Sequence, residues 1–237
     1  MKNYGDADKK AFYTSNASQA AYLRYVDFIV NRYKASPAIF SWEICNEPQY
    51  DCVENCDTTI ITQWATNVSK HIKSQDPKHL VSLGDEGWFA QPYKAPENAN
   101  QYPYKGPKGI DFAKNLAIPD VDFGTFHMYP DQWKIDNEWG NTYIQEHAKV
   151  GKELGKPVIL EEYGVTDPKE RVKTMQKWQD TIVTEGLAGD LFWQFSETLK
   201  DTQPIDFYGV TYDQTAGSAY DEIVLKHVKA VSGQATG

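Results

Sequence analysis

The fold is decided by the stretch Ile39-Phe40-Ser41-Trp42-Glu43-Ile44-Cys45-Asn46-Glu47-Pro48. Its first seven residues are mostly apolar, as expected of a strand that is covered on both faces. Pro48 has no backbone N–H to give to a neighbouring strand, so the strand has to end where Asn46 and Glu47 emerge. The stretch therefore predicts a buried strand whose carboxyl end carries polar side chains.

The same arrangement recurs along the chain. Short β-rich runs stand at residues 38–45, 79–83, 121–127, 157–162 and 191–195. Apolar residues at helical spacing predict helices between and around them, at residues 19–33, after the capping residue Asp57, and at residues 143–154, 169–184 and 218–231. Strand–helix alternation of this kind predicts right-handed βαβ units and a parallel sheet.

Each predicted strand ends in polar or aromatic residues. These endings are Asn46-Glu47-Pro48, Gly84-Asp85-Glu86-Gly87-Trp88, His127-Met128-Tyr129-Pro130, Glu162-Tyr163-Gly164 and Trp193-Gln194-Phe195. A (β/α)8 barrel gathers such residues at the carboxyl ends of all its strands, whereas a doubly wound sheet concentrates them at one switch point. We therefore predict an α/β fold of the (β/α)8 TIM-barrel type, with only about five of the eight strands present, as a single domain over residues 1–237.

Composition excludes several partners. The chain of 237 residues has 24 Lys and Arg against 33 Asp and Glu, a net charge of −9, which argues against binding nucleic-acid phosphates. No apolar run reaches the length of a membrane helix, and the segment from Met1 to Asp8 has no signal-peptide core, so we expect no membrane partner. The five His residues lack metal-ligand spacing, and we expect neither a metal nor a cofactor.

Two strand-end carboxylates, Glu47 and Glu162, are the candidate catalytic pair. Parallel strand ends face one cleft, and two carboxyl groups across a cleft can hydrolyse a glycosidic bond. A separation of about 5–5.5 Å gives retention of configuration and about 6.5–9.5 Å gives inversion. The alternative for either residue alone is a surface or ion-paired carboxylate.

Four motifs carry a resemblance to a known family. The stretch ending in Asn46-Glu47-Pro48 and the stretch Leu160-Glu161-Glu162-Tyr163-Gly164 resemble glycoside hydrolase family 5. The stretches Leu83-Gly84-Asp85-Glu86-Gly87 and Asp122-Phe123-Gly124-Thr125-Phe126-His127-Met128-Tyr129-Pro130 are similar to those of its fungal-type endo-β-1,4-mannanases. The resemblance covers most of residues 4–232.

The resemblance implies roles for individual residues. It makes Glu47 the general acid/base, Glu162 the nucleophile and Asn46 the partner of the substrate 2-hydroxyl. It also places His127 and Tyr129 beside the nucleophile and Trp193 under the −1 sugar. The alternatives are a buried histidine, a strand-end cap and a core indole, respectively.

Further residues are expected at the edges of the cleft. Glu86, Trp88 and Trp133 are candidates for more distal sugar subsites, with surface positions as the alternative. Glu161 should point away from Glu162 on an alternating strand and be structural. Related mannanases often carry Arg where this chain has Gln49, which affects a contact on the leaving-group side.

The cysteines and the chain start bear on localisation and completeness. Cys52 and Cys56 are close enough to form a small loop disulfide, the alternative being two free thiols, and Cys45 is expected to be a buried thiol. The resemblance implies a secreted protein, although this chain carries no signal peptide. It also implies that the chain enters near the end of the third barrel strand, at Asn3-Tyr4-Gly5, and lacks strands 1 to 3.

The expected function is therefore that of a retaining, cofactor-free endo-mannanase. Its polysaccharide substrates would be mannan, galactomannan and glucomannan, and it would be a monomer if the barrel is complete. Two alternatives remain open: an inactive truncated fragment of such an enzyme, and a related endo-β-1,4-glucanase.

Overall fold

The computed structural model describes residues 9–52, 56–90, 102–105, 108–197 and 206–234. The expected chain entry at Asn3-Tyr4-Gly5 lies outside these residues. Internal contacts divide the chain into two compact units, which are described separately. The first contains residues 1–126 and 150–158, and the second contains residues 127–149 and 159–237.

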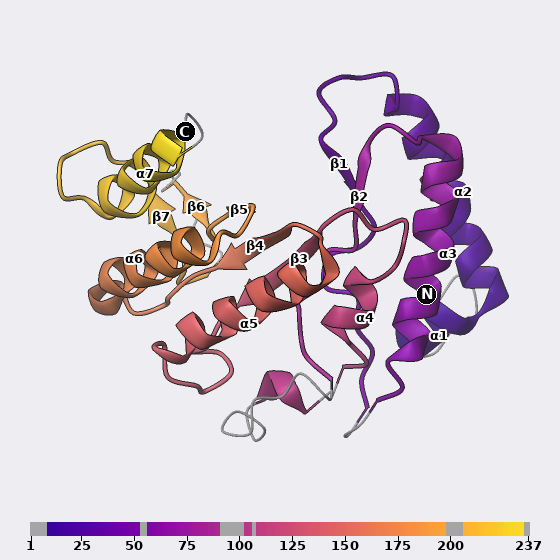
Figure 1. Ribbon diagram of the computed structural model, residues 1–237, viewed down its shortest axis with the longest axis horizontal. Helices are drawn as coiled ribbons and strands as arrows, with labels where there is room; N and C mark the ends of the chain where they lie inside the picture. The colour runs from indigo at the N-terminus through magenta and orange to yellow at the C-terminus, as the bar shows by residue number, and fades with distance from the viewer. Residues whose placement is uncertain (1–8, 53–55, 91–101, 106–107, 198–205, 235–237) are drawn as a thin grey trace. The chain divides into compact units, whose positions relative to one another are not determined.

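The first unit is built on a parallel pair of strands. Its elements are α1 (Lys9–Thr14), α2 (Asn16–Tyr33), β1 (Ser41–Glu43), α3 (Thr59–Gln75), β2 (Leu80–Ser82), η3 (Tyr102–Tyr104), α4 (Phe112–Leu116) and the start of β3 (Gly124–Met128). Figure 1 labels all of them except η3. β1 and β2 are in parallel register, with Ser41 opposite Leu80 and Glu43 opposite Ser82. This pairing confirms the predicted parallel arrangement of the first two strands.

Helix α3 packs its predicted apolar stripe into the core of this unit. Trp64, Val68 and Ile72 are each 3% exposed or less. The Asp57 carboxylate accepts hydrogen bonds from the backbone N–H of Thr59 at 3.0 Å and from its hydroxyl at 2.6 Å. Asp57 thus satisfies an N-terminal amide of the helix, as the sequence predicted.

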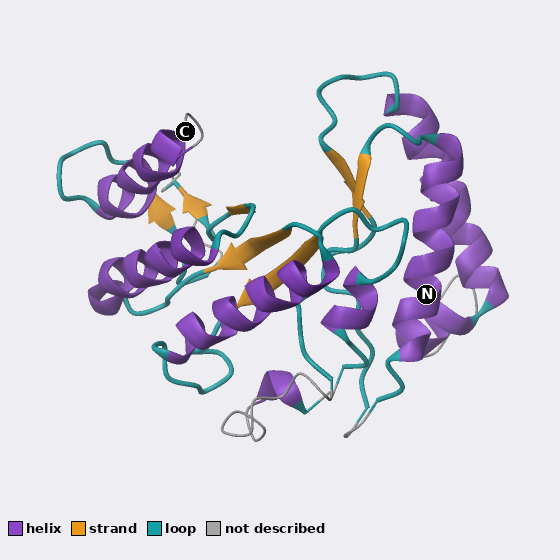
Figure 2. Cartoon of the chain, in the orientation of Figure 1, coloured by secondary structure: helices purple, strands orange, loops and turns teal. Residues whose placement is uncertain are grey.

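The second unit contains the rest of the sheet and the helices that follow it. Its elements are the end of β3, most of α5 (Trp139–Leu154), β4 (Val158–Tyr163), α6 (Pro168–Glu185), β5 (Gly189–Asp190), β6 (Phe195–Ser196), β7 (Val210–Thr211), the π-helix η4 (Asp221–Leu225) and α7 (Lys226–Gln234). Figure 2 shows how short these strands are beside the helices. The strand order is β3-β4-β5, and β4 and β5 run parallel.

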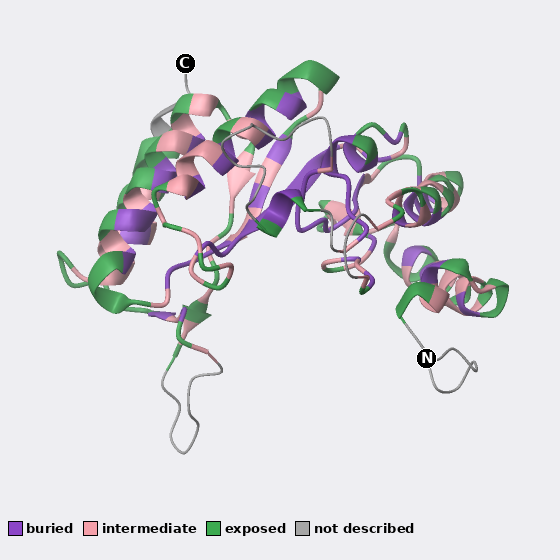
Figure 3. Ribbon diagram, turned by 90° about the horizontal axis from the view of Figure 1, so that it is seen from below, coloured by how far each residue is buried: buried purple, intermediate pink, exposed green. Residues whose placement is uncertain are grey.

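Burial and capping explain two of these elements. Every residue of β3 is buried (Figure 3), as the near-continuous apolar run predicted. The Asp167 side chain caps α6 by accepting from the Lys169 N–H at 2.9 Å, Pro168 follows in the first turn, and Gly186 ends the helix with a left-handed φ of 72°.

The fifth predicted strand, residues 191–195, has different bounds in the structure. Regular pairing is confined to β5, but the backbone continues beside β4 through hydrogen bonds from Leu191 N to Leu160 O (2.9 Å) and Trp193 N to Tyr163 O (2.8 Å). β4 ends at Tyr163, and beyond Trp193 the carbonyl of Gln194 accepts a hydrogen bond from the Val210 N–H at 2.8 Å. The chain then pairs β6 with β7, a contact between two-residue strands that no sequence periodicity could reveal.

The predicted disulfide is confirmed, whereas Cys45 is less buried than predicted. Cys52 and Cys56 form a disulfide with their Cα atoms 5.8 Å apart, and Cys45 is a free, half-buried thiol. Burial raises the pKa of the Cys45 thiol to about 11, so the thiol stays protonated at neutral pH. Among the described residues, no helix is both long and apolar enough to span a bilayer.

Asp76 joins β1 to the end of α3. Its carboxylate is 3% exposed and accepts hydrogen bonds from the indole of Trp42 (2.8 Å), the ring of His79 (2.6 Å) and the amides of Lys78 and His79. Burial alone would raise the pKa of Asp76, but these hydrogen bonds outweigh it and lower the pKa to about 2.

Asp76→Asn should therefore remove a pH-dependent part of the stability. Because the folded-state pKa lies below the ordinary value, ionised Asp76 stabilises the fold above about pH 4, and this stabilisation disappears as the pH falls towards 2. We expect the variant to lose about 1–3 kcal/mol of unfolding free energy at pH 7 and progressively less towards pH 2. Urea unfolding followed by circular dichroism measures this, with the exposed Asp180→Asn as control. A deficit that is constant with pH would contradict the assignment.

Candidate active site

Glu47 emerges at the end of an extended backbone ladder. Beyond β1 and β2, hydrogen bonds continue from Ile44 N to Ser82 O (3.0 Å), Cys45 N to Leu83 O (3.1 Å) and Glu47 N to Gly84 O (2.8 Å). Glu47 has a left-handed φ of 48°, which is uncommon for a residue with a side chain. The ladder therefore carries strand-like order as far as the predicted acid/base.

Gly84 makes this approach of the two chains feasible. A Cβ at Gly84 would lie 2.2 Å from the carbonyl oxygen of Cys45 and 2.7 Å from the Glu43 carboxylate, and the residue has a φ of 76°. Only glycine accommodates both constraints. The motif Gly84-Asp85-Glu86-Gly87 thus has a structural reason to begin with glycine.

Glu47 opens onto a cavity of about 360 Å³ in the first unit. The lining residues are Lys9, Phe12, Tyr13, Cys45, Asn46, Glu47 and Gln49. Two tyrosines hold this loop: Tyr13 accepts from the Gln49 N–H at 2.8 Å and donates to its carbonyl at 3.2 Å, while Tyr22 donates to the carbonyl of Ile44. Aromatic rings beside a carboxyl and amides are a chemistry suited to a sugar.

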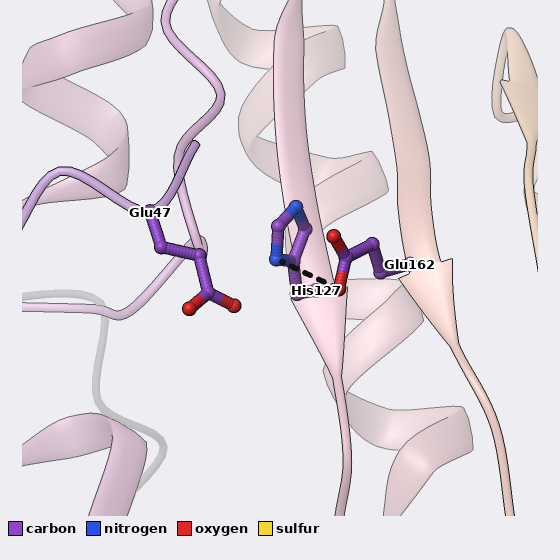
Figure 4. A group of neighbouring side chains, drawn as sticks. All are labelled: Glu47, His127 and Glu162. Carbon is purple, nitrogen blue, oxygen red and sulfur yellow. Dashed lines mark ion pairs between the residues drawn. The ribbon is translucent and has the colours of Figure 1, made fainter. Parts of the chain in front are cut away.

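In the second unit, His127 lies between two carboxylates. Its buried ring places Nδ1 3.5 Å from Oε2 of Glu162 and Nε2 3.6 Å from Oε2 of Glu161. Figure 4 shows the first of these ion pairs and also draws Glu47 on its own loop. Glu161 and Glu162 approach opposite edges of the same imidazole, and the structural role expected for Glu161 stays a prediction.

Tyr129 contacts the predicted nucleophile directly. Its hydroxyl donates to Oε2 of Glu162 at 2.6 Å, and the tyrosine is only 7% exposed. The oxygen of Glu162 that faces His127 therefore also accepts a short hydrogen bond. Together these two contacts define the direction of the Glu162 carboxylate, whose side chain remains 18% exposed.

Trp193 presents a partly open indole. Its residue is 38% exposed, and the indole N–H donates to Oδ2 of Asp206 at 2.9 Å. This position suits an apolar platform and differs from the core alternative. Asp206 was missed in the sequence, since a single Asp between Ile205 and Phe207 gives no signal of its partner.

The three candidates for distal sugar subsites differ in burial. Trp88 is 2% exposed and packs edge to face on Tyr102 with ring centroids 4.7 Å apart, which assigns it to the core of the first unit in place of an exposed sugar platform. Glu86 is 7% exposed. Trp133 is half-buried and packs on Trp139 and Tyr143 of α5. A sequence shows that an aromatic residue follows a strand, but not which side of the loop it faces.

The site residues thus gather in two groups. The second unit brings together Glu162, His127, Tyr129 and Trp193, with carboxylates, a hydroxyl, an imidazole and an indole at the ends of its strands. The first unit places Asn46 and Glu47 at one cavity. Carboxylates and aromatic side chains at the strand ends of a parallel α/β framework are typical of barrel glycosidases.

Comparisons with known proteins agree with this class. The model of the family described as GH family 5 beta-mannosidase-like matches residues 2–219. Mannan endo-1,4-beta-mannosidase A of Aspergillus aculeatus is 43% identical over 236 residues, covering 98% of this chain and 59% of that protein. The chain therefore belongs to glycoside hydrolase family 5.

Solved structures support the fold. The endo-1,4-beta-mannanase from Rhizomucor miehei superposes with a TM-score of 0.86 at 34% identity, over 98% of this chain and 66% of that one. The endo-beta-1,4-mannanase from Thermotoga petrophila gives a TM-score of 0.86 at 30% identity, over 97% and 54%. The predicted α/β fold of the (β/α)8-barrel type is confirmed. The chain spans 44–62% of the length of eight curated relatives that it matches.

Gly164, which follows Glu162-Tyr163, should not tolerate a side chain. A Cβ there would lie 2.4 Å from the Trp193 carbonyl and 2.7 Å from the Tyr208 ring. We expect Gly164→Ala to lower the unfolding free energy by about 1–3 kcal/mol, because the backbone of residues 193–194 and the Tyr208 ring must move apart.

Gly189→Ala is the matched control. Its Cβ would meet only Ile159 at 4.0 Å, so we expect a change below about 0.5 kcal/mol. Denaturant unfolding of both variants makes the comparison, and equal stabilities would refute the crowding at Gly164.

Proposed function

We propose that this chain is the catalytic part of a retaining, endo-acting glycoside hydrolase that cleaves β-1,4-mannosidic bonds in mannan, galactomannan and glucomannan. The observation that carries the proposal is the Glu162 carboxylate, held by the Tyr129 hydroxyl and faced by buried His127. This arrangement stands in a family 5 chain whose similar relatives are named mannan endo-1,4-beta-mannosidases.

In the first step, Glu162 attacks the anomeric carbon and forms a covalent glycosyl ester. Glu47 donates a proton to the glycosidic oxygen, so the leaving sugar departs as an alcohol. In the second step, ionised Glu47 takes a proton from water, the water oxygen attacks the same carbon, and the Glu162 carboxylate is released. Two displacements on one carbon retain its configuration.

The neighbouring residues support this chemistry. Tyr129 orients the attacking oxygen of Glu162, and a nucleophile held in the reactive direction loses less entropy on reaching the transition state. Asn46 is assigned to the substrate 2-hydroxyl, where hydrogen bonds strengthen as the oxocarbenium-like charge develops. Trp193 is assigned to the apolar face of the sugar in the −1 subsite.

The cavity beside Glu47 is assigned to the leaving-group sugar. The proton donor has to lie beside the bond that breaks, and Phe12 and Tyr13 supply apolar surface next to it. Gln49 stands where related mannanases often carry Arg, and a neutral amide gives weaker hydrogen bonds than a guanidinium.

We also propose that the protein is secreted, and that it is a monomer if its barrel is complete. The Cys52–Cys56 disulfide supports an oxidising compartment.

Removal of either carboxyl group should slow hydrolysis by orders of magnitude. We expect Glu162→Ala to lower the release of reducing sugar from galactomannan by about 10³-fold or more, and Glu47→Ala by about 10²–10⁴-fold. Glu170→Ala, an exposed carboxyl on α6, should retain the parental rate. Equal rates for the parent and Glu162→Ala would refute the nucleophile.

Substrate and completeness are decided by the same assay. Faster hydrolysis of mannan than of soluble cellulose supports the proposal, and the reverse supports an endo-β-1,4-glucanase. A folded chain that cleaves neither polysaccharide would instead support an inactive fragment.

A further inference from the structure

Asp206 connects two site residues on the strand-end side of the second unit. Its Oδ2 accepts from the indole of Trp193 at 2.9 Å and from the side-chain amide of Gln194 at 2.7 Å. Its Oδ1 accepts from the backbone N–H of Tyr208 at 2.8 Å. One carboxylate therefore fixes both the indole and the start of the following segment.

Tyr208 continues the connection towards the nucleophile. It is 4% exposed, and its ring packs edge to face on Tyr129 with centroids 5.1 Å apart. Its hydroxyl donates to Oδ1 of Asp131 at 3.0 Å. Burial raises the pKa of Tyr208, so the hydroxyl stays protonated and remains a donor.

Asp131 and Arg171 anchor this arrangement. Oδ2 of Asp131 accepts from the Thr166 N–H at 3.0 Å and from its hydroxyl at 2.7 Å. The buried guanidinium of Arg171 donates to the carbonyls of Val165 (2.8 Å), Thr166 (3.3 Å), Gly209 (2.7 Å) and Phe207. The loop after β4 is thus tied to the segment that carries Asp206 and Tyr208.

We propose that Asp206, Phe207 and Tyr208 form a short segment, here called the strap, that positions both the nucleophile Glu162 and the indole of Trp193. Tyr208 is a positioning residue that acts through Tyr129 on Glu162, and Asp206 is a positioning residue that acts on Trp193. This inference rests on the proposed glycosidase function, because positioning has meaning only for that reaction.

The close packing supports a single rigid strap. A side chain at Gly164 would collide with both the Trp193 carbonyl and the Tyr208 ring, so Gly164 packs between Tyr208 of the strap and Trp193, which Asp206 holds. The rings of Tyr208 and Tyr129 are in contact, so a displacement of Tyr208 should also displace Tyr129. The Tyr129 hydroxyl donates to Glu162, and its displacement should change the position of that carboxylate.

Substitutions at Tyr208 and at Asp206 should affect different kinetic constants. Tyr208→Phe keeps the ring but removes the anchor to Asp131, so kcat should fall about 3- to 10-fold with KM nearly unchanged. Asp206→Asn should mainly raise KM, because the Trp193 indole loses its charged acceptor while the nucleophile keeps Tyr129. Tyr212→Phe changes a half-exposed tyrosine directly after β7; it is the matched control and should leave both constants unchanged.

A double-mutant cycle tests whether Tyr208 acts through Tyr129. In a Tyr129→Phe background we expect Tyr208→Phe to change kcat by less than about 2-fold, since the contact that it controls is already lost. Multiplicative losses in the cycle would overturn the positioning role, because two independent effects on folding or binding combine in that way.

A second cycle is independent of activity. The unfolding free energies of Tyr208→Phe, Asp131→Ala and the double variant should be non-additive, because each single substitution already removes the hydrogen bond between Tyr208 and Asp131. Additive effects would overturn the strap. If the parent protein hydrolysed no polysaccharide, the proposed function would fail, and the unfolding cycle would still decide whether Tyr208 and Asp131 are coupled.

Discussion

The position of β4 in the sheet order β3-β4-β5 is the constraint on which the arrangement of the second unit depends. A strand that is flanked on both sides brings its last residues beside the ends of two other strands. Glu162 is therefore met by His127 and Tyr129 from the β3 side, while the backbone of Trp193 is hydrogen-bonded to Tyr163. Contacts that are 30 or more residues apart in sequence follow from this one placement.

The contacts around Glu162 show how the orientation of its carboxylate is fixed. Coulombic attraction to an imidazole depends on the protonation of the ring, whereas the hydroxyl of Tyr129 donates in either state. The short Tyr129 contact therefore fixes the direction of the Glu162 carboxylate whatever the charge on His127. A directed oxygen is what a nucleophile needs, and a broad cluster of charges would not supply it.

Much of this could be predicted from sequence because it depends on order along the chain. Apolar runs ending in Asn46-Glu47-Pro48 and Glu162-Tyr163-Gly164 reveal strands and the residues at their ends. The helices predicted between them are present, since an apolar stripe such as Trp64, Val68 and Ile72 repeats at helical spacing.

What could not be predicted depends on side-chain direction and long-range packing. Trp88 follows a strand like a site residue but is buried, because the loop turns its ring into the core. Tyr208 and Asp131 are 77 residues apart and meet only through the folded sheet. Strands of two residues, such as β6 and β7, are too short for any alternation to show.

The most direct test of the account is to trap the covalent intermediate. A 2-deoxy-2-fluoro-β-mannobiosyl fluoride forms the glycosyl ester with a retaining enzyme but slows its hydrolysis, since fluorine destabilises the oxocarbenium-like transition state. Peptide mass mapping should find a single label on Glu162. A label on a different residue, or inversion of the anomeric centre in the first-formed product, would contradict the account.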